Sequence, residues 1–144
     1  MPSTKQSRIN SVNSTSERGQ SLVELAIGFL ILMLLLAGAV EFGIVFFQYV
    51  QLRDAAQEGA LYGSYCQNDA QITERAINAS YQPIDMTTAG VDVFTEYVEN
   101  GDAVKVTLLY DHTVFMPFMS AIVGDHITLR ADVTDTILDR NGCL

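Results

Sequence analysis

The segment from Leu25 to Val40 limits the possible folds of this chain more than any other feature, because it holds no charged residue and almost no polar one. Beyond Glu41, apolar residues resume and continue to Val50. A helix that crosses a bilayer needs about 20 mostly apolar residues. We therefore predict a transmembrane helix over 20–50. The alternative is the buried helix of a soluble protein, but 144 residues are too few to surround a helix that is apolar on every side.

The charges on the two sides of this segment predict its orientation. Before it lies a polar stretch that carries Lys5, Arg8 and Arg18 against the single acidic residue Glu17. After it the chain is acidic, and the whole chain has a formal net charge of -9. Basic residues are retained on the cytoplasmic side of a membrane. We expect a single-pass protein of the inner (cytoplasmic) membrane, with a cytoplasmic N-terminus and a periplasmic or extracellular C-terminal domain.

Two glutamates interrupt the apolar pattern, Glu24 at the start of the predicted span and Glu41 near its outer end. A charged side chain at the centre of a bilayer costs about 2.5–3.5 kcal/mol on insertion scales. Glu24 is either a carboxylate that extends to the interface or one that pairs with a cation on another chain. Glu41 is an intramembrane polar residue whose role the sequence leaves open.

Three sequence elements carry a resemblance to a known family. Residues 18–25 read Arg-Gly-Gln-Ser-Leu-Val-Glu-Leu, residues 41–43 read Glu-Phe-Gly, and residues 55–60 read Ala-Ala-Gln-Glu-Gly-Ala. The first resembles the processing site of type IV pilin-like proteins, a basic leader that ends in glycine and is followed by a glutamate and a long apolar helix. Over about 18–66 the chain resembles the TadE-like family, minor pilins or pseudopilins of the tight-adherence (Flp) pilus system.

The resemblance implies a structural function. A prepilin peptidase would cut between Gly19 and Gln20, which makes 1–19 a cytoplasmic leader peptide. Glu24 would be the assembly residue, its carboxylate pairing with the new ammonium group of Gln20 on a neighbouring subunit. The partners would be other pilin or pseudopilin subunits, the assembly machinery and the membrane. Leu25 stands where the major pilins of this system tend to have an aromatic residue, which favours a minor subunit.

Other functions remain open from the residues alone. Ala37-Gly38-Ala39 matches the small-residue site at which signal peptides are cut, and cleavage there would release a soluble protein that begins at Val40. The protein could also be a secreted or membrane-anchored binding domain unrelated to pili. A third class is a small outward-facing enzyme that uses His112 or His126.

Residues 51–144 are predicted to form an extracytoplasmic α+β domain. Small residues between Ala55 and Gly63 recur at helical spacing and predict a face that packs on the protein's own sheet, or alternatively on another subunit. A second helix is expected over Asp69–Ala79, with Asn68 as its N-cap. Alternating apolar residues and the turn Asn100-Gly101 predict a three-stranded antiparallel meander, packed on the helical stem. The strands of this meander are expected over 91–98, 104–110 and 127–133.

The remaining reactive side chains are few. Cys66 and Cys143 are predicted to form a disulfide, since oxidation is allowed outside the cytoplasm, although two free thiols are the alternative. His112 and His126 have no cysteine partners at metal-binding spacing, and the chain carries no phosphate-binding or nucleophile motif. We expect no enzyme activity, no metal or other cofactor and no small-molecule substrate. The acidic charge also argues against nucleic acid as a partner.

Overall fold

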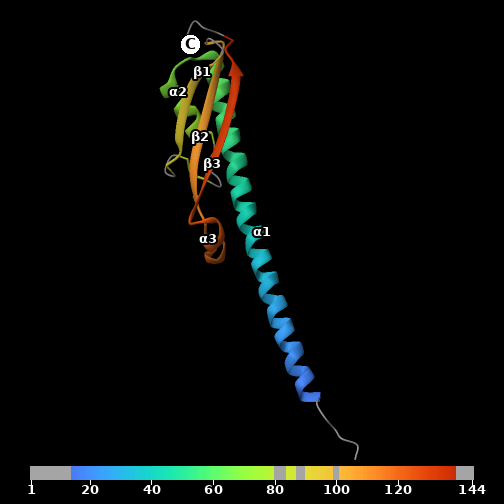
Figure 1. The fold of residues 1–144 in the computed structure, drawn as a ribbon. Helices are drawn as coiled ribbons and strands as arrows, with labels where there is room; N and C mark the ends of the chain where they lie inside the picture. Colours follow the sequence, from blue (N-terminus) through green and yellow to red (C-terminus); the bar gives the residue numbers. More distant parts are fainter. Residues whose placement is uncertain (1–13, 80–83, 87–89, 99–100, 139–144) are drawn as a thin grey trace, which may run out of the picture. The chain divides into compact units, whose positions relative to one another are not determined.

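The computed structural model describes residues 14–79, 84–86, 90–98 and 101–138, with side chains from residue 19 onward. The chain contacts divide it into two compact units, 1–36 and 37–144. Figure 1 labels the six elements. In chain order they are helix α1 (Ser14–Tyr65), helix α2 (Asp69–Asn78), strand β1 (Asp92–Val98), strand β2 (Ala103–Thr113), helix α3 (Pro117–Val123) and strand β3 (His126–Thr136).

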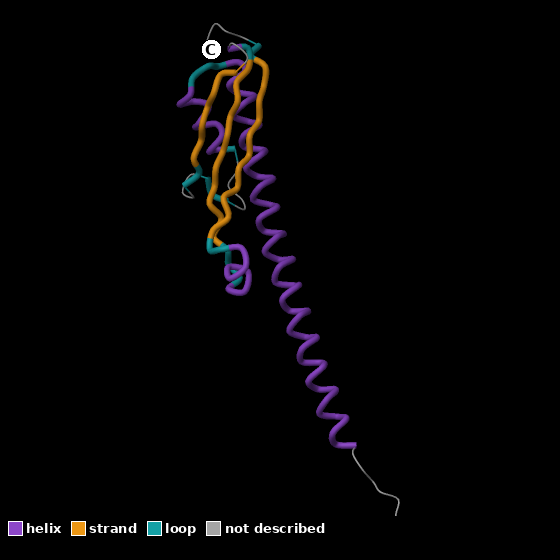
Figure 2. Tube along the Cα trace, viewed as in Figure 1, coloured by secondary structure: helices purple, strands orange, loops and turns teal. Residues whose placement is uncertain are grey.

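The three strands form one antiparallel sheet in the order β1-β2-β3, which confirms the predicted α+β fold with a meander (Figure 2). Val106 of β2 lies between Thr95 of β1 and Val133 of β3. Val104, Val106 and Leu108 alternate with less buried residues along β2, as expected for a sheet with one face on the core. Gly101 lies in the β1–β2 turn at a φ of 85°, in the left-handed region that favours glycine.

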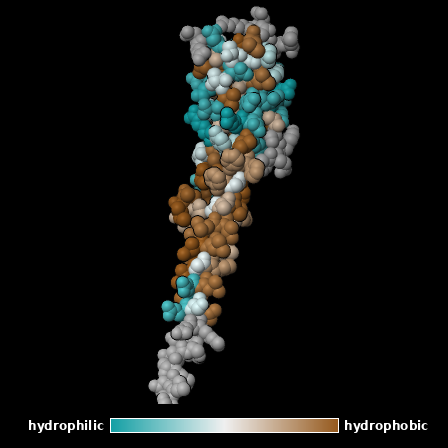
Figure 3. All heavy atoms as spheres, turned by 90° about the vertical axis from the view of Figure 1, so that its right-hand side faces the viewer, coloured by the Kyte–Doolittle hydropathy of each residue, from teal (hydrophilic) through white to brown (hydrophobic). Residues whose placement is uncertain are grey.

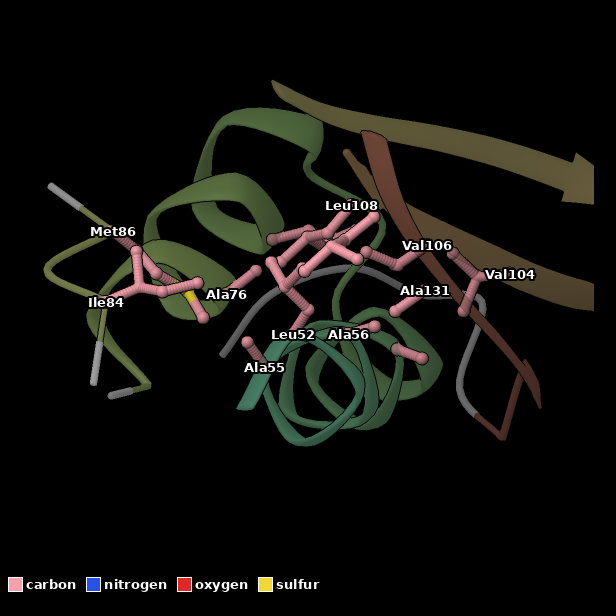
Figure 4. Close-up of a cluster of buried hydrophobic side chains, with 13 residues drawn as sticks. Leu52, Ala55, Ala56, Ala76, Ile84, Met86, Val104, Val106, Leu108 and Ala131 are labelled. Carbon is pink, nitrogen blue, oxygen red and sulfur yellow. The ribbon is translucent and has the colours of Figure 1, made fainter. Parts of the chain in front are cut away.

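The core of the second unit lies between α1 and the sheet. Leu52, Ala55 and Ala56 of α1 face Val106 and Leu108 of β2 (Figure 4). The core cluster is completed by further buried residues of α1 and β2, by residues of α2 and β3, and by two residues of the segment after α2. These are Ala60, Ile72, Ala76, Ile84, Met86, Val104, Leu129 and Ala131. The small-residue face of α1 thus packs on the protein's own sheet, as predicted.

Two glycines allow this close approach of helix and sheet. A methyl group built on Gly63 would lie 3.1 Å from both γ-carbons of Val104 and 3.1 Å from the δ-carbon of Ile72. One built on Gly59 would lie 3.1 Å from the Cβ of Ala76. These distances are shorter than ordinary van der Waals contact, so a larger residue at either position would require its neighbours to shift by a few tenths of an ångström.

Helix α2 begins as its sequence predicts. Asn68 is the N-cap, and its side-chain oxygen accepts a hydrogen bond from the backbone N–H of Gln71. Between α2 and β1, the Gln51 side chain holds the backbone of Ile84 by two hydrogen bonds, donating to the carbonyl at 2.5 Å and accepting from the N–H at 2.7 Å. This pair ties the α2–β1 connection to α1.

The structure also differs from the expectations. Strands β2 and β3 are longer than the alternating patterns indicated, because pairing continues through the polar residues 111–113 and 134–136. The connection around Pro117, for which the sequence predicts neither a helix nor a strand, contains α3. Proline fixes a helical φ at the first turn and needs no N–H partner there, which explains where this helix begins.

Candidate functional site

The apolar segment of α1 within the first unit has no covering layer in the part of the chain that the structure describes. The most apolar 18-residue window of this helix has none of its residues buried. Leu25 and Leu30 are each 69% exposed. Figure 3 shows hydrophobic side chains covering this segment and hydrophilic ones over the second unit. Since water is a poor solvent for so much apolar surface, the single N-terminal apolar helix indicates a single-pass membrane protein.

The predicted processing and assembly residues lie on this same stretch of α1. Gly19 and Gln20 are helical, and a methyl group built on Gly19 would meet no atom within 4 Å. Glu24 is exposed, and among the described residues no hydrogen bond or ion pair holds its carboxylate. The arrangement leaves both the cleavage position and the carboxylate open to another molecule.

Glu41 behaves in the opposite way, because its carboxylate is buried inside the second unit with only 3% of the residue exposed. Its Oε1 lies 2.9 Å from Nε2 of His112 and accepts a hydrogen bond from the backbone N–H of Phe115 at 3.0 Å. Its Oε2 accepts from the N–H of Met116 at 3.3 Å. An ionised carboxylate offers only acceptors, so Nε2 of His112 is the donor. Glu41 thus attaches α1 to the end of β2.

His112 was considered from the sequence only as a candidate catalytic or metal-binding residue. In the structure it is 5% exposed and serves as the side-chain partner of Glu41, across 71 residues of sequence. His126 is exposed and lies 3.5 Å from the Thr113 hydroxyl. Within the described residues no group of three or more His, Cys, Asp or Glu side chains could hold a metal ion.

The predicted disulfide partner Cys143 lies outside the described residues, so the pairing with Cys66 stays a prediction. Cys66 is buried just after α1, and its Sγ lies 3.2 Å from the side-chain oxygen of Gln71. The backbone N–H of Leu138 donates to the carbonyl of Ser64 at 2.9 Å. The chain beyond β3 therefore returns to the end of α1.

Comparisons with known proteins bear on the apolar helix. The family model described as TadE-like protein matches residues 19–61, from the predicted cleavage glycine into the small-residue face of α1. Searches of curated proteins and of solved structures found no match. A TadE-like segment points to association with the membrane and with pilus systems of the tight-adherence type. The resemblance inferred from the sequence motifs is thus confirmed, and residues 19–61 of this chain form a TadE-like segment.

Proposed function

We propose that this chain is a structural minor pilin or pseudopilin of a tight-adherence pilus and not an enzyme. A prepilin peptidase cuts it between Gly19 and Gln20, and the mature subunit assembles with other pilin or pseudopilin subunits. It takes no cofactor, nucleic acid or small-molecule substrate. The observation that carries the proposal is the combination of an exposed apolar helix with an unpartnered Glu24 just after the glycine. The TadE-like match, which starts at Gly19, supports it.

The cleavage changes the charges at the start of the apolar helix in a way that favours assembly. Removal of 1–19 takes away the basic residues that hold the N-terminus in the cytoplasm and creates an ammonium group on Gln20. In an apolar bundle, an ion pair between this ammonium and Glu24 of a neighbouring subunit is far stronger than in water. Because an unpaired buried carboxylate is costly, the pair also fixes the register in which two helices pack.

The processing step is tested by the mass of the N-terminal peptide of the full chain, extracted from membranes of cells with and without a prepilin peptidase. We expect Gln20 at the front only when the peptidase is present. Gly19→Leu should leave the precursor uncut. Gly28→Leu is the matched control, because a methyl group built on either glycine meets nothing within 4 Å. Normal cutting of Gly19→Leu refutes the assigned site, and a terminus at Val40 would mean a secreted domain.

The assembly role of Glu24 is tested separately. Glu24→Gln keeps the size of the side chain and removes its charge, and Glu24→Ala removes the group altogether. Both variants should insert into the membrane and be processed, yet fail to enter or support the pilus, as measured by pilus yield. Ser21→Ala, one turn earlier on the same exposed helix, is the control. Unchanged pilus yield with Glu24→Gln would show that no charge pair forms.

A further inference from the structure

The connection between β2 and β3, residues 114–124, carries an apolar surface that the second unit does not bury. It contains no charged residue, although Asp111 and Asp125 lie close to its two ends. Phe115 is 79% exposed, and Phe118 and Ile122 are each 68% exposed. None of the residues of α3 is buried. We call residues 114–124 the β2–β3 loop.

Two contacts fix this loop beside one short stretch of α1. Glu41 accepts hydrogen bonds from the first two peptide N–H groups after Val114, those of Phe115 and Met116. Three residues earlier on α1, a methyl group built on Gly38 would lie 3.7 Å from Sδ of Met119. The loop is therefore held at the level of residues 38–41, which belong to the apolar run.

This level coincides with the expected outer edge of the hydrocarbon. A bilayer core about 30 Å thick takes about 20 helical residues. Counted from Leu25, where the uncharged apolar segment begins, such a core ends at Ile44, which places residues 38–41 in its outermost two turns. The exposed carboxylates of Asp111 and Asp125 belong in water, which sets a limit to how deep the loop lies. A bilayer core of this extent and the two aspartates together define the depth at which the loop can contact lipid, which is the outer interface.

The loop also meets the chief requirement of peptide groups near lipid, which is that they be hydrogen-bonded within the protein. Besides the two donors held by Glu41, the N–H groups of Met119 and Ser120 donate to the carbonyl of Met116. The N–H of Gly124 and that of Val114 donate to the carbonyls of Ser120 and Asp125. Pro117 has no N–H to satisfy. The loop thus presents apolar side chains and few free donors.

We propose that the β2–β3 loop is a second membrane contact of this protein. The side chains of Phe115, Phe118 and Ile122 enter the outer interface of the bilayer beside α1. The buried pair of Glu41 and His112 holds the loop in this position from the side of the second unit. This second contact restricts the orientation of the sheet relative to the membrane, which α1 alone would leave free. The proposal requires only that α1 spans the membrane, so a failure of prepilin processing would leave it unaffected.

The chain has no tryptophan, so the fluorescence of a single introduced tryptophan reports the surroundings of that one position. The full chain with Phe118→Trp is reconstituted at low protein-to-lipid ratio in phosphatidylcholine–phosphatidylglycerol vesicles, with or without brominated acyl chains. Phe115→Trp is a second probe, in case the first variant does not fold. Phe94→Trp is the control, because Phe94 is 55% exposed on β1 and not on the loop.

We expect the indole at 118 or 115 to emit at shorter wavelength than the one at 94 and to lose most of its emission to brominated lipid. The indole at 94 should be quenched by acrylamide from the water and unaffected by bromine. Equal acrylamide quenching at 118 and 94 would overturn the proposal. Blue-shifted emission without bromine quenching would also overturn it, since a neighbouring protein subunit would then cover the loop.

Discussion

Replacing Glu41 by Gln tests whether the buried carboxylate holds the second unit together at its membrane end. The side chain keeps its size, but only one acceptor oxygen remains for the three donors that now surround it. The N–H of Met116, which donates to the second carboxylate oxygen, would instead face an amide group that is itself a donor. The substitution therefore breaks one hydrogen bond and removes the charge from the other two.

The expected cost follows from these three bonds. A hydrogen bond to a charged group contributes about 1.5–3 kcal/mol and a neutral one about 0.5–1.5 kcal/mol. At the lower ends of these ranges, losing one charged bond and weakening two others adds up to about 3.5 kcal/mol. This agrees with the range of about 3–5 kcal/mol for breaking a buried charged pair. Since about 1.4 kcal/mol corresponds to a factor of ten, local opening should become at least about a hundredfold more frequent.

Amide hydrogen exchange in the full-length protein in detergent measures this opening directly. Exchange at Phe115 and Met116 should accelerate about a hundredfold in Glu41→Gln, while amides in the middle of β2 change little. Glu58→Gln is the matched control, because Glu58 is exposed and its ion pair with Arg75 spans 3.8 Å. Unchanged exchange at both amides in Glu41→Gln would refute the reasoning, since the carboxylate would then contribute nothing to this contact.

Three further outcomes are expected. Gly63→Ala should destabilise the second unit by about 1–2 kcal/mol in urea unfolding, because overpacking a core costs about 1–3 kcal/mol. Gly43→Ala is the reference variant, since nothing lies within 4 Å of a methyl group built there. Burial, with the neighbouring carboxylate of Asp69, raises the pKa of Tyr97 to about 12. The stability that Tyr97 contributes is therefore complete below about pH 10 and is lost as the pH rises to about 12. Tyr97→Phe should abolish this loss when the free energy of unfolding is measured against pH. Reduction of the purified protein should add two hydrogen atoms to its intact mass if Cys66 and Cys143 are bonded, and an unchanged mass would mean free thiols.

Local signals in the sequence predicted most of the fold. The period of the apolar residues indicated α1 and the three strands, and the polar residue before α2 indicated its start at Asp69. The small residues from Ala55 to Gly63 correctly indicated a closely packed helix face. These features depend on residues a few positions apart, so a single sequence contains the information.

The contact between Glu41 and His112 could not be predicted in this way. The two residues are 71 positions apart, and their meeting depends on the register of β2 against α1, which no local pattern determines. The one indication in the sequence is that a glutamate in an apolar helix needs a partner. Helix α3 was missed because seven residues are too few to show helical periodicity, although the uncharged run around it was visible.

The separation of Glu41 from its partners also affects the order of events during synthesis. Glu41 is synthesised with the first half of the chain, whereas His112, Phe115 and Met116 are added 71 to 75 residues later. At about 5–20 residues per second, that interval is on the order of 4–15 seconds. Throughout it, groups other than His112 and these two peptide N–H groups must solvate the carboxylate. Formation of α1 and formation of the Glu41 contacts are therefore separate kinetic steps, and translation of residues 42–116 sets the shortest time between them.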